Sequence, residues 1–130
     1  MSSPTTPVPV ALILCDDLIV QQNTDKITLV GIFDRLRATE FPSPPRSIHA
    51  FVSLIDSIGD VRLRLVCTKA DSGEEVYALE GTAFFPDRLT TVNVHFTARN
   101  LQFPAPEVYY MQLYGDGVFI AERKLTVVEP

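Results

Sequence analysis

The sequence contains no tryptophan, and only two histidines and two cysteines among its 130 residues. The absence of tryptophan excludes a flat tryptophan platform for carbohydrate. A zinc site of the usual kind needs about four converging Cys, His or carboxylate ligands. No Cys or His here stands in a CxxC or HxxxH pair. We therefore expect neither a tryptophan platform nor a zinc centre.

Basic residues and long apolar runs are also scarce. The chain has 11 Lys and Arg against 16 Asp and Glu, with a formal net charge of −5. Nucleic acid and anionic lipid attract a basic surface, so we expect neither as a partner. The apolar run Val10–Cys15 is far shorter than the ~20 residues of a membrane-spanning helix. The first basic residue is Lys26, so the basic start of a secretory signal is missing. These features favour a cytoplasmic protein.

The sequence motifs of common catalytic sites are missing too. There is no GxSxG nucleophile turn and no GxxxxGK[ST] phosphate loop. Cys67 falls in a predicted inward stripe, and Cys15 stands beside Asp16 and Asp17, which disfavour its thiolate. We expect no catalytic residue, no cofactor and no enzyme activity. The cysteine spacing would suit an inter-sheet disulfide, but without an export signal two buried, reduced thiols are favoured.

What the chain does have is enough apolar sequence for one domain. With 130 residues, 46% of them hydrophobic, it can bury a core without disulfides or metals. Residues 1–9 are small and Pro-rich, which predicts a flexible lead-in. Residues 10–130 are predicted to form a single domain.

Alternation of apolar and polar residues predicts strands throughout this domain. The clearest runs are Val61–Thr68, Thr91–Arg99 and Val108–Tyr114. A further run, Ile48–Ile55, is apolar on both faces and is typical of a central strand. The predicted inward residues of the three alternating runs are Val61, Leu63, Leu65, Cys67, Val92, Val94, Phe96, Ala98, Tyr109, Met111 and Leu113.

Turn residues separate these runs. Asn23–Lys26, Asp71–Gly73 and Gly115–Gly117 carry the Asn, Asp and Gly that tight hairpins favour, and the prolines fall between strands. The spacing predicts a two-sheet, immunoglobulin-like antiparallel sandwich of roughly eight strands, with a closed β-barrel as the alternative. In immunoglobulin-like domains a Tyr near the start of the penultimate strand bonds back to the chain. Tyr109 is the candidate, or Tyr110 if the register shifts.

Two stretches carry a family resemblance: ALILCDDLIVQQNTDKITLVGIFDRL with the Pro-rich loop after it, and the late FP…PEVYYMQL…GDG segment. Over most of the chain after residue 9, the sequence resembles a bacterial family of small stand-alone proteins known only as a domain of unknown function. The resemblance implies a β-sandwich and a bacterial source. It implies no activity, ligand or site residue.

Carboxylates near predicted strand ends are candidates for a calcium site at one end of the sandwich. Calcium requires six to eight oxygen ligands, whereas Asp is also simply a common turn residue, and we favour turn carboxylates. The candidates are Asp16, Asp17, Asp56, Asp60, Asp71, Asp87 and Asp116.

Outward-facing Arg62, Arg64, Tyr110 and Tyr114 make up a candidate interaction surface, since exposed arginines can meet an acidic partner and tyrosines can form a small platform. A plain solvated face is the alternative for the arginines, and edge packing or a contact with the second sheet is the alternative for the tyrosines. Sheet edges accept protein partners. The sequence therefore favours a non-enzymatic protein-interaction or scaffolding module, whose partner is another protein or a second copy of the chain. A small-ligand or calcium-binding domain that uses loops at one end of the sandwich is the alternative.

Overall fold

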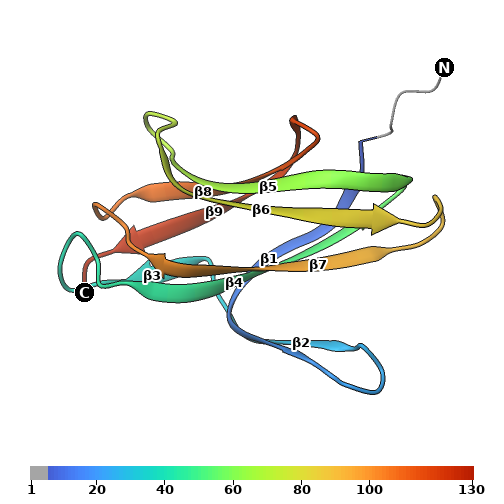
Figure 1. The fold of residues 1–130 in the computed structure, drawn as a ribbon. Helices are drawn as coiled ribbons and strands as arrows, with labels where there is room; N and C mark the ends of the chain where they lie inside the picture. Colours follow the sequence, from blue (N-terminus) through green and yellow to red (C-terminus); the bar gives the residue numbers. More distant parts are fainter. Residues whose placement is uncertain (1–5) are drawn as a thin grey trace.

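Strands account for all the regular structure in the part of the chain that the structure describes. The computed structural model describes residues 6–130, and these form nine β-strands in two separate sheets (Figure 1). The described part contains no helix that could cross a membrane. The all-β prediction is confirmed, and the alternative of one closed barrel is wrong because the strands pair into two open sheets.

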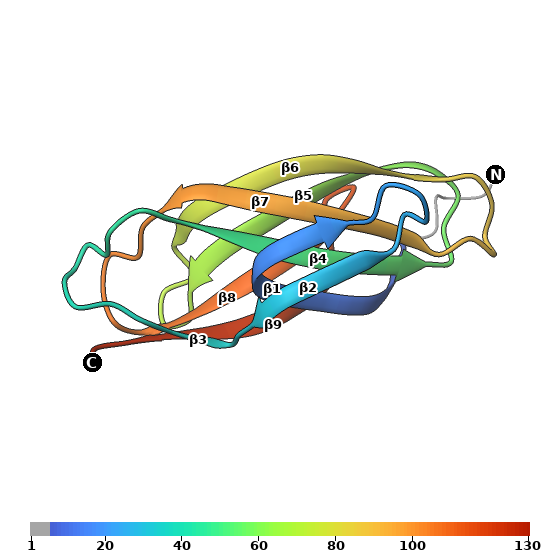
Figure 2. The same cartoon turned by 90° about the horizontal axis from the view of Figure 1, so that it is seen from below.

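The first sheet has four strands and the second has five (Figure 2). In spatial order, the first sheet consists of β2 (Ile27–Ile32), β1 (Val8–Val20), β4 (Arg46–Ile55) and β7 (Val92–Leu101). The second sheet consists of β3 (Arg35–Arg37), β9 (Val118–Val128), β8 (Val108–Gly115), β5 (Gly59–Lys69) and β6 (Glu75–Phe85).

The short strand β3 corrects two details of the predicted sandwich. It raises the number of strands in the described residues to nine, and it pairs with β9 in parallel, whereas the other pairs are antiparallel. A strand of three residues shows too little alternation to be recognised in a sequence.

The start of the chain also differs from prediction. The predicted lead-in covered residues 1–9, of which 1–5 lie outside the described residues. Strand β1 already begins at Val8, which pairs with Ile55 of β4. The same strand continues through Asp16 and Asp17, so these two carboxylates lie inside a strand and not at its end.

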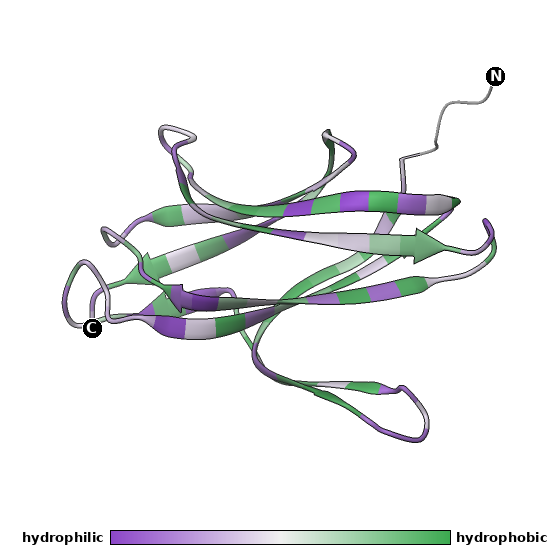
Figure 3. Ribbon diagram, viewed as in Figure 1, coloured by the Kyte–Doolittle hydropathy of each residue, from purple (hydrophilic) through white to green (hydrophobic). Residues whose placement is uncertain are grey.

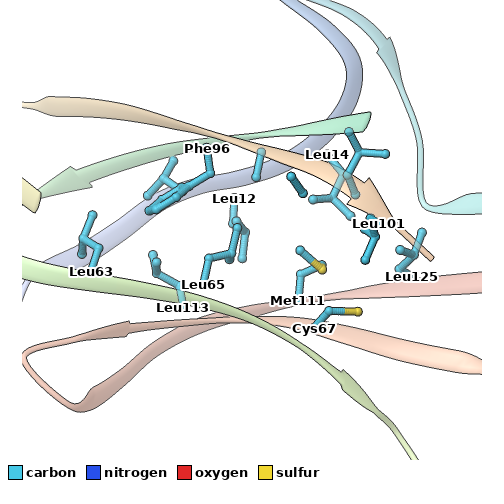
Figure 4. Packing of buried hydrophobic residues seen from close by; sticks show 14 of the residues in the cluster. Leu12, Leu14, Leu63, Leu65, Cys67, Phe96, Leu101, Met111, Leu113 and Leu125 are labelled. Atoms are coloured by element: carbon cyan, nitrogen blue, oxygen red, sulfur yellow. The ribbon is translucent and has the colours of Figure 1, made fainter. Parts of the chain in front are cut away.

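The predicted inward faces are confirmed. All four inward residues of β5 are at most 1% exposed, and Tyr109, Met111 and Leu113 of β8 are equally buried. Figure 4 shows five of them, Leu63, Leu65, Cys67, Met111 and Leu113, in the space between the two sheets. On the outward face of β5, Val66 and Thr68 are also buried, although neither belongs to the core cluster. Neighbouring side chains therefore cover part of this outer face.

The turns form where the sequence placed them. The β1–β2, β5–β6 and β8–β9 connections contain Asp25, Gly73, Asp116 and Gly117, all with positive φ. Asp and Gly tolerate this left-handed conformation better than most residues. In Figure 1 the β5–β6 and β8–β9 hairpins both bend away from the first sheet. The two hairpins therefore flank the outer face of the second sheet.

Candidate functional site

Three of the four residues of the predicted interaction surface meet in one groove. The groove has a volume of about 780 Å³ and lies on the outer face of the second sheet. Arg62, Arg64 and Tyr114 line it, together with Glu75 and Asp116; we call it the outer groove. Tyr110 follows the same alternation but is not among the lining residues.

Arg64 lies at the centre of the outer groove because its strand neighbours come from both sides of β5. Its Cα partners are Glu80 on β6 and Tyr114 on β8. Its two Nη groups donate to the two carboxylate oxygens of Glu75, at 3.1 and 2.9 Å. The hydrogen bond from Arg64 lowers the pKa of Glu75 from its ordinary value. Arg64 is thus already neutralised by a partner within the chain.

The remaining charges of the outer groove have both signs. Arg62 and Glu80 are exposed, and the Arg62 backbone N–H donates to Asp116 Oδ1 at 3.0 Å. This bond ties the β8–β9 turn to β5. The lining residues include no Cys, His or Ser. The outer groove can therefore bind a polar surface, and it offers none of the side chains of a Ser- or Cys-based nucleophile site.

The calcium candidates are dispersed over the molecule. Asp56 lies 3.5 Å from Arg88, and Asp87 accepts hydrogen bonds from Leu89 and Thr90. The hydroxyl and backbone hydrogen bonds from Thr90 and Leu89 lower the Asp87 pKa. Asp60 lies at the start of β5, and Asp71 lies in the β5–β6 turn. No three His, Cys, Asp or Glu side chains gather into a metal site within residues 6–130.

Asp16 and Asp17 point to opposite faces of β1, as expected for neighbours in a strand. Asp16 Oδ1 lies 3.6 Å from Arg46 Nη2, and Asp17 Oδ1 lies 3.9 Å from His49 Nε2. They therefore do not share a ligand.

Both cysteines are free and buried. Cys67 lies in the core, and burial raises its pKa to about 12. Cys15 lies outside the core cluster and is paired in register with His49 on one side and Ile32 on the other. Burial, then Asp16 and Asp17, raise its pKa. Sequence reasoning missed the proximity of Cys15 and His49, which depends on the β1–β4 register. Because the thiolate is disfavoured, this pair does not resemble an activated nucleophile.

The β1–β2 hairpin is a second surface, which sequence reasoning missed. It consists of the end of β1 and all of β2, and it projects from the sandwich in Figure 1. Its aliphatic residues all lie outside the core cluster. They are Leu18, Ile19, Val20, Ile27, Leu29, Val30 and Ile32. Figure 3 shows an apolar stretch in this hairpin followed by a polar turn.

The cross-strand register divides these residues between two faces. Leu18 pairs with Leu29 and Val20 with Ile27, so these four aliphatic side chains share one face. The other face carries Ile19, Val30 and Ile32, each about half exposed. The signal in the sequence was the apolar stretch Ile27–Ile32, whose lack of polar alternation suits a covered strand. In the structure Ile27 and Leu29 are half-buried, and Val30 and Ile32 are exposed.

The fold and these surfaces define a two-sheet β-sandwich with an open polar groove on one side and an exposed apolar hairpin on the other. The chain belongs to a family of unknown function, DUF6941, whose model matches residues 10–128. This match confirms the resemblance to a family known only as a domain of unknown function. No curated protein matches the chain.

Proposed function

We propose that the domain is a non-enzymatic protein-interaction module that binds a second copy of itself through the β1–β2 hairpin. One observation carries the proposal. Of the four edge strands in the described residues, β2 is the only one without a charged residue: β7 contains Arg99, β6 contains Glu75 and Glu80, and β3 contains Arg35 and Arg37.

Natural proteins usually protect an edge strand with charge, proline or a covering segment, because its free backbone groups can pair with another chain. Strand β2 has none of these devices along Ile27–Ile32, and its hydrogen-bonded neighbour is β1 alone. The exposed Val30 and Ile32 side chains add apolar area beside the free edge. Pairing with another strand would give hydrogen-bond partners to the free backbone groups of β2. It would also bury the Val30 and Ile32 side chains.

The charges that flank β2 favour a second copy as the partner. Lys26 precedes the strand and Asp34 follows it, each four residues from Val30. In a two-fold antiparallel pairing centred on Val30, Lys26 of each copy lies toward Asp34 of the other. A single self-complementary surface then serves both copies, as in most two-fold dimers.

Sedimentation velocity over a range of concentrations tests the proposal. We expect a reversible dimer for the wild type and at least a tenfold weaker dimer for Val30→Lys, which places two like charges at the symmetry axis. Leu89→Lys is the matched control, since Leu89 is an aliphatic side chain, 95% exposed, in the β6–β7 loop. A wild-type monomer at every concentration, or equal weakening by Leu89→Lys, would contradict self-association.

The net charge and the thiols bear on the class of partner and on the cellular location. The net charge of −5 disfavours nucleic acid and anionic membranes as partners. Two buried free thiols are typical of a reducing compartment. Both support our proposal of a cytoplasmic protein whose partners are proteins.

A further inference from the structure

The outer groove is large enough to hold a small molecule. Its volume of about 780 Å³ lies within the range of roughly 300–1,000 Å³ that is usual for small-molecule sites. The groove crosses three neighbouring strands of the second sheet, with Arg62 and Arg64 on β5, Thr82 on β6 and Tyr114 on β8. Arg64 pairs in register with Tyr114, and Arg62 pairs with Thr82. The backbone of the sheet therefore fixes the spacing of these lining side chains.

The polar side chains that line the outer groove are open to solvent, so a bound molecule can reach them. Arg62, Glu80 and Thr82 are exposed, and Arg64 and Tyr114 are half-buried. Within residues 6–130, neither the Arg62 guanidinium nor the Glu80 carboxylate forms an ion pair. A guanidinium only donates hydrogen bonds, a carboxylate only accepts them, and a threonine hydroxyl does both. The outer groove therefore offers both donors and acceptors to a ligand.

The charges that line the outer groove nearly cancel. The lining contains two basic residues, Arg62 and Arg64, and three acidic ones, Glu75, Glu80 and Asp116. Arg64 and Glu75 already neutralise each other through their two hydrogen bonds. A phosphate, carboxylate or ammonium group in the groove would meet like charges as well as opposite ones, which is unfavourable. Neutral hydroxyl groups, which donate as well as accept hydrogen bonds, match this mixture.

One aromatic side chain adds a flat apolar surface to the outer groove. Tyr114 lines the groove, and its ring packs against the Phe119 ring in a T-shaped arrangement, with centroids 5.8 Å apart. The C–H groups of a sugar ring can pack against the face of such an aromatic ring. Sugars combine this apolar face with many neutral hydroxyl groups, and they therefore match both the ring and the charge balance of the groove.

We propose that the outer groove binds a neutral oligosaccharide. Arg62 and Thr82 donate hydrogen bonds to sugar hydroxyls, Glu80 accepts hydrogen bonds from them, and the Tyr114 ring packs against one sugar ring. This site is independent of the proposed self-association, because the outer groove lies on the second sheet whereas β2 belongs to the first.

Nuclear magnetic resonance on the isotope-labelled full chain tests this site. The probes are four neutral sugars, cellopentaose, xylopentaose, mannopentaose and maltopentaose. The comparison compounds are the acidic sugar pentagalacturonate and a peptide of alternating Lys and Glu residues. We expect saturable shifts of the Arg62, Thr82 and Tyr114 amides with at least one neutral sugar, and weaker binding of both comparison compounds. The proposal is wrong if none of the four neutral sugars gives saturable shifts at these amides. It is equally wrong if pentagalacturonate or the peptide binds there as tightly as the best neutral sugar.

Variants of Tyr114 separate the ring from the fold. Tyr114→Ala should weaken binding of the best neutral sugar at least tenfold, whereas Tyr114→Phe keeps the ring and should bind it nearly as the wild type does. Tyr110→Ala is the matched control, because Tyr110 lies on the same strand but outside the outer groove. If Tyr114→Ala does not fold, Tyr114→Leu keeps an apolar side chain without a flat ring and should also weaken binding. Wild-type affinity in either folded variant would refute the role of the ring and with it the proposed site.

A variant of Arg62 tests the polar side of the site. Arg62→Ala should weaken binding of the same sugar, whereas Arg88→Ala should not change it. Arg88 is the matched control because it is an arginine outside the outer groove, 3.5 Å from Asp56. Equal affinities of the Arg62→Ala and Arg88→Ala variants would contradict the proposed hydrogen bonds.

Discussion

At the scale of single residues, Tyr109 links the core to the loop that precedes its strand. Its side chain is completely buried, and its hydroxyl donates to the Ala105 carbonyl at 2.7 Å and accepts from the Ala105 N–H at 3.3 Å. Burial raises the Tyr109 pKa to about 12. The sequence predicted both the inward ring and the bond to the preceding loop, and both are confirmed.

Chemical denaturation of Tyr109 variants measures separately what the hydroxyl hydrogen bonds and the packing of the ring contribute to stability. Tyr109→Phe keeps the ring and should lower the free energy of unfolding by about 1 kcal/mol, the net value of one hydrogen bond. Tyr109→Ala leaves a cavity and should cost ~3–5 kcal/mol. Tyr110→Ala is the control on the opposite face, where the side chain is only half-buried. If Tyr110→Ala proves the more damaging alanine variant, the ring of Tyr109 is not the main anchor.

At the scale of elements, β1 pairs with a different strand along each part of its length. Its first part pairs with β4 from Val8 to Cys15, and its last part pairs with β2 from Cys15 to Val20. Gly31 of β2 has a φ of +69°, and a Cβ there would lie 2.5 Å from Asp16 Oδ2. Glycine at this position therefore leaves room for the Asp16 side chain, which lies close to Arg46 of β4.

Substitution of Gly31 should release the β1–β2 hairpin. Gly31→Ala combines left-handed strain of about 1–2 kcal/mol with the Asp16 clash, so we expect amides of Leu18–Val20 and Ile27–Ile32 to lose protection from hydrogen exchange. A lone two-stranded hairpin is only marginally stable, whereas β4 amides should stay protected.

Gly73→Ala is the matched control, because Gly73 has a φ of +74° and no atom within 4 Å of the added Cβ. It carries the same strain in the β5–β6 turn without a clash. Unchanged hairpin exchange in Gly31→Ala would show that the hairpin does not depend on this glycine.

At the scale of the whole molecule, side chains join the two sheets on both sides. On one side, the Tyr77 hydroxyl of β6 donates to the Arg99 carbonyl of β7 at 2.7 Å and accepts from the Arg99 N–H at 3.0 Å. On the other, Arg123 of β9 donates from Nη1 to the Leu12 carbonyl of β1 at 3.3 Å. These bonds link strands of the two sheets that no strand pairing joins.

Removal of the Tyr77 hydroxyl should loosen one side of the sandwich. Tyr77→Phe leaves two backbone groups of Arg99 without their partner, and we expect a loss of about 1 kcal/mol in the free energy of unfolding. Tyr114→Phe is the control, since the Tyr114 hydroxyl makes only a 3.4 Å contact with Gln112. Urea denaturation of both variants makes the comparison. Equal losses in the free energy of unfolding would mean that the Tyr77 hydroxyl, which links β6 to β7, stabilises the fold no more than the Tyr114 hydroxyl does.

Much of the fold could be predicted because the signals are local. The alternation in β5, β7 and β8 identified their inward residues, and Asp and Gly identified the hairpin turns. The outward set Arg62, Arg64 and Tyr114 came from the same alternation. Their meeting in one groove depends on β5 pairing with β8, which brings together residues 50 positions apart in the sequence. The immunoglobulin-like label, which depends on the finer topology, stays a prediction.

The sequence by itself determined which segments are strands, which of their faces are apolar and where the chain turns, because these properties depend on neighbours within a few residues. The tertiary structure decided which surfaces are covered. Alternation shows that a face is apolar, but not whether another sheet packs on it, so the exposed β2 edge could not be foreseen. For the same reason the approach of Phe103 to the start of β4 was invisible in the sequence: Arg46 pairs with Leu101 only when β4 and β7 lie side by side in the first sheet.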